Sequence, residues 1–133
     1  MSYLLDTSVC VAALRAHEPT LRRLAAVAPR EVAVSAMTTA ELWYGVLKSR
    51  SPDATGRELE RFLALIDVLP FDDAAARHHA RTHRALEAQG IPIGERDLVI
   101  AATALAHDRT VASGNSREFT RVAGLVVEDW TRG

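Results

Sequence analysis

The sequence has little of what would indicate a secreted, zinc-binding or membrane protein. Its 133 residues include one cysteine, Cys10, which excludes an internal disulfide and a cysteine-based zinc site. The longest apolar run, Leu98 to Ala106, is far shorter than the ~20 residues of a membrane span. Asp6 interrupts the first apolar run, which argues against a signal peptide. We therefore expect one soluble, cytoplasmic domain over residues 1–133 with no membrane partner.

The chain also lacks a strong net charge and has almost no lysine. The formal net charge is −1, so no global basic field indicates nucleic-acid binding. Among 16 basic residues, Lys48 is the one lysine. Arginine forms bidentate phosphate contacts and stacks on bases, so a local arginine surface is one interpretation. An arginine-rich composition inherited from the genome explains the same count equally well.

Apolar periodicity and turn residues predict short strands that alternate with helices. Such alternation favours an α/β fold in which a short central parallel sheet is flanked by helices in three layers. Ligands of such sheets bind outside the carboxyl ends of the strands. The predicted strands or extended segments are 3–5, 32–34, 68–71, 110–112 and 125–127. The predicted helices are 7–15, 19–28, 38–49, 52–66, 72–89 and 95–106, and 116–120 is predicted to be a short turn or helix.

Two aspartates lie where carboxylates are costly unless they are paired or bound to a metal ion. Asp6 directly follows the first predicted strand, and helix capping is the alternative explanation for it. Asp97 shares a helix face with Ile100 and Ala104, so it is predicted to point inward. An acid favoured by the helix dipole is the alternative there. We interpret both residues as functional.

Glu41 and Asn115 each have an equally complete structural explanation. Thr38 and Glu41 have the spacing of a capping box, in which the glutamate bonds back to the threonine amide. Asn115 follows Gly114 in a turn, where asparagine is common, although its amide oxygen is also able to bind a cation or orient water.

Other conspicuous residues favour structural interpretations. His79 and His83 have the spacing of a zinc pair, but no third ligand is evident, so a solvated helix face is expected. The closing segment, Glu128 to Trp130, is predicted to lie at the edge of the sheet and at the protein surface. An apolar helical stripe from Leu59 to Ile66 is expected to be core.

Four segments in this order, over nearly the whole chain, resemble PIN-domain ribonucleases and, within them, the VapC-type toxins of bacterial toxin–antitoxin pairs. The segments are Leu5-Asp6-Thr7-Ser8, Thr38 to Gly45, Ile93 to Ala102, and Asn115 to Phe119 with the closing Glu128-Asp129-Trp130. In place of the usual threonine and a further residue before Asn115, this chain has Ser113 and Gly114. It also has Ala123 where a proline commonly precedes the late Gly-Leu.

The resemblance implies an acidic centre at Asp6, Glu41 and Asp97, with Asn115 at a fourth position. It implies that these carboxylates hold Mg²⁺ or Mn²⁺ and that a metal-activated water hydrolyses RNA. It further implies a homodimer and a cognate VapB-type antitoxin that covers the active site and an apolar groove. Gly114 is expected to leave the fourth-site loop less ordered.

Two other classes of function deserve comparison. Aspartate-phosphorylating folds fit poorly, because dehalogenase-like phosphatases need a second aspartate where Ser8 stands, and receiver domains need a late lysine. A PIN-like module that binds nucleic acid or protein without efficient cleavage is the remaining alternative. All three acids are present, which favours the nuclease.

Overall fold

The structure, a computed structural model, describes residues 1–133 and contains five strands and seven α-helices. A short 3₁₀ turn at Pro29–Glu31 precedes the second strand. The strands are β1 (Tyr3–Leu5), β2 (Val32–Ser35), β3 (Asp67–Leu69), β4 (Thr110–Ser113) and β5 (Val127–Asp129). The helices are α1 (Thr7–Leu14), α2 (Glu18–Ala25), α3 (Ala36–Lys48), α4 (Pro52–Leu63), α5 (Asp73–Gln89), α6 (Glu95–Ala106) and α7 (Ser116–Phe119).

All five strands form one parallel sheet in the order β3-β2-β1-β4-β5. The chain builds outward from β1 to β3, then returns to the other side of β1 to add β4 and β5. The strand order therefore reverses between β1 and β4, and such a reversal opens a crevice at the carboxyl ends of the two strands. Asp6 follows β1 and Ser113 ends β4, so both residues lie at this crevice.

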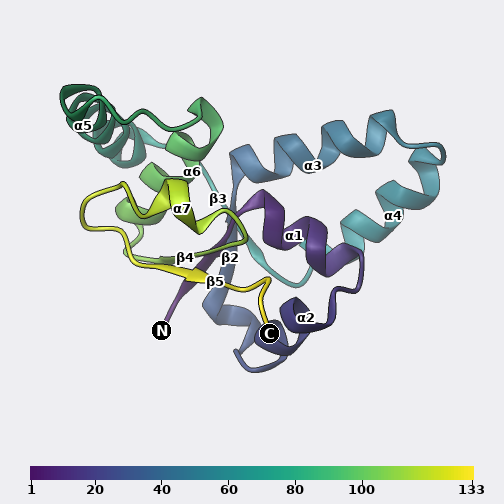
Figure 1. The fold of residues 1–133 in the computed structure, drawn as a ribbon. Helices are drawn as coiled ribbons and strands as arrows, with labels where there is room; N and C mark the ends of the chain where they lie inside the picture. Colours follow the sequence, from purple (N-terminus) through teal and green to yellow (C-terminus); the bar gives the residue numbers. More distant parts are fainter.

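Successive strand residues face opposite sides of the sheet and build two apolar cores. Tyr3 and Leu5 join one core, which α1, α3 and α4 cover together with the buried Cys10. Leu4 joins the other core, to which α5, α6 and α7 contribute. The helices therefore form layers on both sides of the central sheet, as Figure 1 shows. The predicted three-layer α/β fold is confirmed.

The boundaries of several elements differ from the prediction by a few residues. Helix α3 begins at Ala36 rather than at Thr38, because the Ser35 side chain accepts a hydrogen bond from the Thr38 amide and caps the helix two residues earlier. The last strand is Val127–Asp129, not 125–127. Helices α2 and α4 each end three residues before the predicted limit. Strand β3 begins and ends slightly earlier, at Asp67–Leu69.

The prediction that the closing segment lies at the surface was wrong for Trp130. Its side chain is only 1% exposed and packs against the Tyr3 ring, with the ring centroids 4.9 Å apart. The indole nitrogen donates to Glu128, and the Trp130 carbonyl accepts from the buried Thr20 hydroxyl. The segment after β5 therefore closes one of the two cores. None of the helices combines the length and apolarity that crossing a bilayer requires.

Candidate active site

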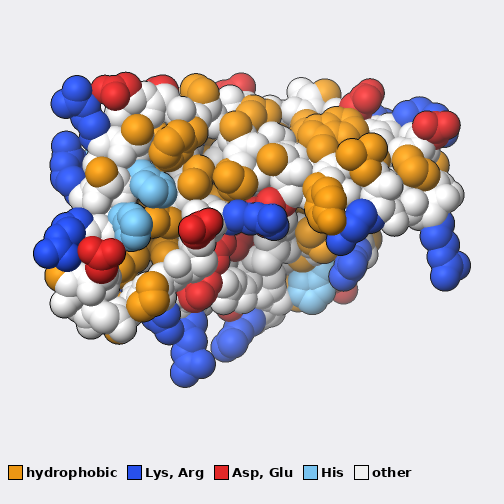
Figure 2. All heavy atoms as spheres, turned by 90° about the horizontal axis from the view of Figure 1, so that it is seen from above, with side chains coloured by type: hydrophobic (Ala, Val, Ile, Leu, Met, Phe, Trp, Pro, Cys, Tyr) orange, Lys and Arg blue, Asp and Glu red, His pale blue; other side chains and the backbone are white.

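The residues predicted to carry the chemistry reach one end of the sheet from different elements. Asp6 comes from the end of β1, Glu41 from the middle of α3 and Asp97 from the first turn of α6. Asn115 precedes α7, directly after β4. In Figure 2, acidic side chains gather near the centre of this face, with a basic side chain beside them.

Asp6 is a buried carboxylate held by three donors. The Ser8 hydroxyl donates to Oδ1 at 2.6 Å, the Val9 amide donates to the same oxygen at 2.9 Å, and the Ser113 hydroxyl donates to Oδ2 at 2.5 Å. Burial raises the pKa of Asp6, and these hydrogen bonds partly offset the rise because they favour the charged form. The bond from Val9 also makes Asp6 the cap of α1, so the structural and functional interpretations are compatible.

Glu41 does not form the capping box suggested by its spacing. Since α3 begins at Ala36, Glu41 lies well inside the helix. Its Oε1 accepts a 2.8 Å hydrogen bond from the Thr7 hydroxyl of α1, and its Oε2 lies 3.6 Å from the Arg96 guanidinium of α6. The capping explanation for Glu41 is therefore wrong. The side chain instead connects three elements at the mouth of the crevice.

Asp97 is half-buried, and its electrostatic environment is unfavourable for a charged carboxylate. Burial, a hydrogen bond and charge repulsion from Glu118, and weaker repulsion from Asp6 and Glu41 raise the pKa of Asp97 to about 7. The structure thus brings Asp6 and Glu41 close enough to Asp97 to affect the ionisation of Asp97. Next to Asp97 in sequence, the buried Leu98 anchors the helix in the core.

Asn115 contacts Asp97 and also Glu118, a residue that the sequence analysis did not assign to the site. Its amide nitrogen donates to Glu118 Oε2 at 3.0 Å and lies 3.4 Å from Asp97 Oδ2. The hydrogen bond with Asp97 lowers the pKa of Glu118. The signal for Glu118 was its position, three residues after Asn115 at the start of a short helix.

Gly114 has a steric role that the sequence did not indicate. A Cβ added at Gly114 would lie 2.7 Å from the methyl group of Thr131. The Gly114 amide donates to the Ser8 hydroxyl, which itself donates to Asp6. The glycine therefore lets the C-terminal segment pack behind the loop that supports Asp6. The expectation that Gly114 leaves this loop less ordered did not take the packing of Thr131 against the loop into account.

The donor groups of the site are all oxygens, the type that Mg²⁺ and Mn²⁺ prefer. In the observed side-chain arrangement, no three acidic, histidine or cysteine groups converge as a ready-made ligand set. Asp6 is turned towards two serines, and Glu41 towards Thr7 and Arg96. Magnesium keeps several of its waters and needs only one or two carboxylates, so the donor set fits such an ion.

Comparison with known proteins agrees with this architecture. The sequence profile of the PIN domain matches residues 3–125. The tRNA(fMet)-specific endonuclease VapC of Shigella flexneri is 34% identical over 131 residues, which cover 98% of this chain and 99% of that protein.

Two crystal structures extend the comparison to three dimensions. VapBC2 from Rickettsia felis, bound to a DNA fragment from their promoter, gives a TM-score of 0.91 at 32% identity and covers 98% of this chain and 99% of that one. VapBC-5 from Mycobacterium tuberculosis is described as a member of the VapBC family of toxin-antitoxin systems. It gives a TM-score of 0.72 at 32% identity and covers 96% of this chain and 95% of that one. The chain belongs to the PIN-domain family and, within it, to the VapC ribonucleases.

Proposed function

We propose that this protein is the toxin of a toxin–antitoxin pair and cleaves RNA as a metal-dependent endoribonuclease centred on Asp6, Glu41 and Asp97. One observation carries the proposal. Carboxylates from three elements line the crevice where the strand order reverses, and burial, the contact with Glu118 and, more weakly, repulsion from Asp6 and Glu41 raise the pKa of Asp97 to about 7. A structural role alone does not account for a half-buried carboxylate whose charged form is disfavoured by its neighbours in this way.

Asp6 and Asp97 are the proposed ligands of Mg²⁺ or Mn²⁺, with Glu41 completing or orienting the set of ligands. When bound, such a cation makes water a stronger nucleophile near neutral pH and offsets negative charge on the phosphate. The cation would also relieve the repulsion at Asp97, because it favours the charged form of every carboxylate beside it.

The surrounding side chains hold these groups in place. Ser8 and Ser113 fix both oxygens of Asp6, and Thr7 fixes Glu41. The exposed Arg96 side chain, which pairs with Glu41, is well placed to exchange that partner for an RNA phosphate. Asn115 is proposed to orient Asp97 or a water through its amide.

A VapB-type antitoxin is the proposed protein partner, and the toxin itself is proposed to form a homodimer. The similarity to VapBC assemblies supports the antitoxin. An apolar cavity of about 270 Å³ between α1, α2 and α4 fits a hydrophobic segment of such a partner. Phe62 and Ile66, from the stripe expected to be core, line it beside Leu65, which is 71% exposed. Leu59 itself is buried, as predicted.

RNA sequencing after brief induction of the protein in bacterial cells tests this function. New 5′ ends at defined positions are expected with the wild-type protein, and none with Asp6→Ala. The tRNA(fMet) named for the Shigella relative is the first RNA to examine. Purified protein should cut the same RNA with Mg²⁺ or Mn²⁺ and stop with a chelator. Binding of RNA without metal-dependent cleavage would instead support the alternative of a catalytically weak binding module.

A further inference from the structure

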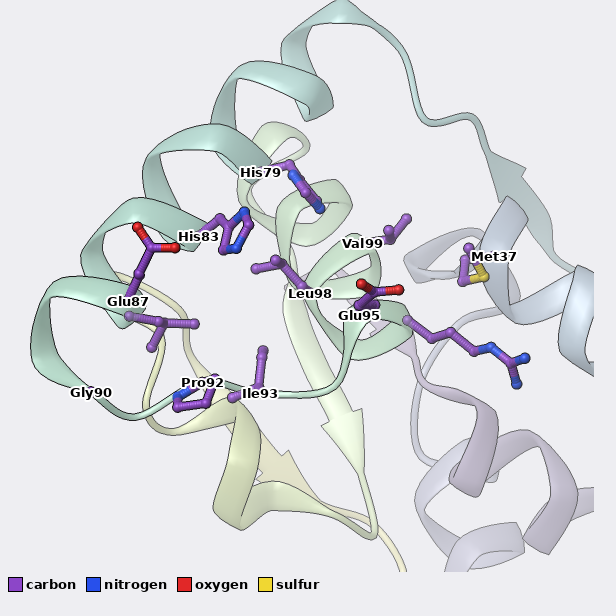
Figure 3. A pocket seen from close by; sticks show the side chains of 12 residues that line it. Met37, His79, His83, Glu87, Gly90, Pro92, Ile93, Glu95, Leu98 and Val99 are labelled. Atoms are coloured by element: carbon purple, nitrogen blue, oxygen red, sulfur yellow. The ribbon is translucent and has the colours of Figure 1, made fainter.

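A second feature lies beside the acidic site and contributes none of the three proposed catalytic carboxylates. A cavity of about 660 Å³ opens between α5, α6 and the start of α3. Leu86, Ile93 and Leu98 supply apolar side chains to its wall, while His79 and His83 project towards it from α5 (Figure 3). The volume lies in the range of pockets that bind small organic ligands.

Arg96 links the cavity to the acidic site. This side chain lines the cavity, and its guanidinium lies 3.6 Å from Glu41 Oε2. Met37, from the first turn of α3, also lines the cavity and precedes Glu41 by four residues on the same helix. In Figure 2, histidine side chains appear on the α5 side of the same face that displays the central acidic side chains. A ligand anchored at the carboxylates would therefore reach the cavity directly.

The lining has the chemistry that recognises an unstacked nucleobase. The rings of His79 and His83 lie 5.9 Å apart at 70°, and Phe71 meets His79 edge-on at 5.7 Å. Unpaired RNA bases stack on aromatic rings, histidine included, and are read by hydrogen bonds along their edges. Glu95 is exposed at the rim, forms no ion pair and offers a carboxylate to the N–H groups of a base.

We propose that this cavity binds one unpaired base of the RNA, next to the phosphate that is cleaved. The base packs against His79 and His83, while Arg96 binds a neighbouring phosphate. The inference rests on the proposed function, because it places the scissile phosphate at Asp6, Glu41 and Asp97. It also assigns sequence preference to α5, an element that contributes no catalytic carboxylate.

A second copy of the chain is the competing occupant of the cavity. An interface core is depleted in charged groups. This cavity instead carries Glu95 and Arg96 at the end nearest the acidic site, where an RNA strand would pass. The charged groups and the Arg96 side chain shared with Glu41 therefore favour RNA, and oligomeric state becomes one of the measurements.

Binding without cleavage provides the test. Fluorescein-labelled hexaribonucleotides of A, C, G or U are titrated with the protein in a chelator, and anisotropy reports affinity. His79→Ala/His83→Ala should weaken the best-bound hexamer by about tenfold, the loss expected when one base loses its stacking partner. His79→Phe/His83→Phe keeps two aromatic rings and should retain most of the affinity. His78→Ala is the matched control, since His78 lies on α5 but lines a different cavity.

Two results would overturn the inference. One is unchanged RNA affinity in the folded His79→Ala/His83→Ala variant. The other is conversion of a dimer to a monomer by the same substitutions, seen in sedimentation, with RNA affinity unaltered. Failure of the proposed function has a different outcome, because wild-type protein would then bind the hexamers through the histidines but cleave no RNA when metal is restored.

Discussion

The Thr7 hydroxyl donates a 2.8 Å hydrogen bond to Glu41 Oε1 and thereby joins the first turn of α1 to the middle of α3. Thr7 follows Asp6 directly, so the same turn fixes two of the proposed catalytic carboxylates. Its hydroxyl also lies 3.4 Å from that of the buried Thr38. The threonine thus positions Glu41 without itself being a proposed ligand.

Replacing Thr7 with valine should separate positioning from folding. Valine keeps the shape of the side chain but removes the donor to Glu41, so cleavage should fall by about tenfold. The free energy of unfolding should fall by no more than about 1.5–3 kcal/mol, the contribution of one hydrogen bond to a charged group. Thr7→Ser restores the hydroxyl and should restore most of the rate. Equal rates for wild type and Thr7→Val, measured on the same RNA, would show that Glu41 does not need this contact.

Magnesium should stabilise the folded protein. Asp6 and Glu41 repel the charged form of Asp97 when no cation is present, and a ligand that binds only the folded state raises the melting temperature by mass action. Millimolar Mg²⁺ should therefore raise Tm for wild type and have little effect on Asp6→Asn/Asp97→Asn, as measured by differential scanning fluorimetry. Equal shifts in both proteins would indicate that the ion binds elsewhere.

The raised pKa of Asp97 predicts a specific dependence of stability on pH. Its pKa is about 7 in the folded state, against an unfolded value of about 3.9, so the folded state binds the extra proton between those limits. The stability from this group is therefore lost as pH rises from about 4 to about 7. Asp97→Asn removes the charge, and its amide is still able to donate to Glu118.

Without metal, Asp97→Asn should therefore melt at a higher temperature than wild type at about pH 8, with the gap closing towards about pH 4. Thermal melts across this range give the comparison, and Asp53→Asn on α4 is a control for a first-turn aspartate far from the site. A constant difference between Asp97→Asn and wild type at every pH would contradict the assigned cause.

A side chain at position 114 should leave the stability of the protein largely unchanged only if the Thr131 side chain is also shortened. A Cβ at 2.7 Å from the Thr131 methyl group overpacks the loop, so Gly114→Ala should cost about 1–3 kcal/mol of unfolding free energy. Thr131→Ala removes the clashing atoms, and the double variant should recover much of that loss in urea denaturation. Strict additivity of the two substitutions would show that the contact does not limit this position.

The sequence predicted the fold well because its local signals agree with the tertiary structure. Gly90, at a φ of 67°, ends α5 where the glycine predicted it, and Glu95 begins α6 at the predicted residue. The register of the closing strand and the start of α3 were harder to predict. The closing strand depends on the burial of Trp130, which packs against the distant Tyr3. The start of α3 is set by a local contact, the Ser35 cap, which the capping-box spacing of Thr38 and Glu41 obscured in the sequence.

Some residues of the candidate site could be predicted from the sequence, and others could be found only from the folded structure. Asp6 and Asp97 stand out because carboxylates are unusual after a buried strand and on an apolar helix face. Glu41 had two equal explanations until its Thr7 contact distinguished them. Ser113 and Glu118 have no unusual local sequence context. They reach Asp6 and Asp97 only because β4 pairs beside β1 in the folded sheet.

The rate of RNA cleavage by single and double carboxylate variants tests the central claim most directly. If Asp6, Glu41 and Asp97 act as one metal-dependent centre, Asp6→Asn and Asp97→Asn should each slow cleavage by about 100-fold or more, and the double variant should be no slower than the slower single variant. Rates that multiply in the double variant, or cleavage at near wild-type speed after either substitution, would contradict a shared centre.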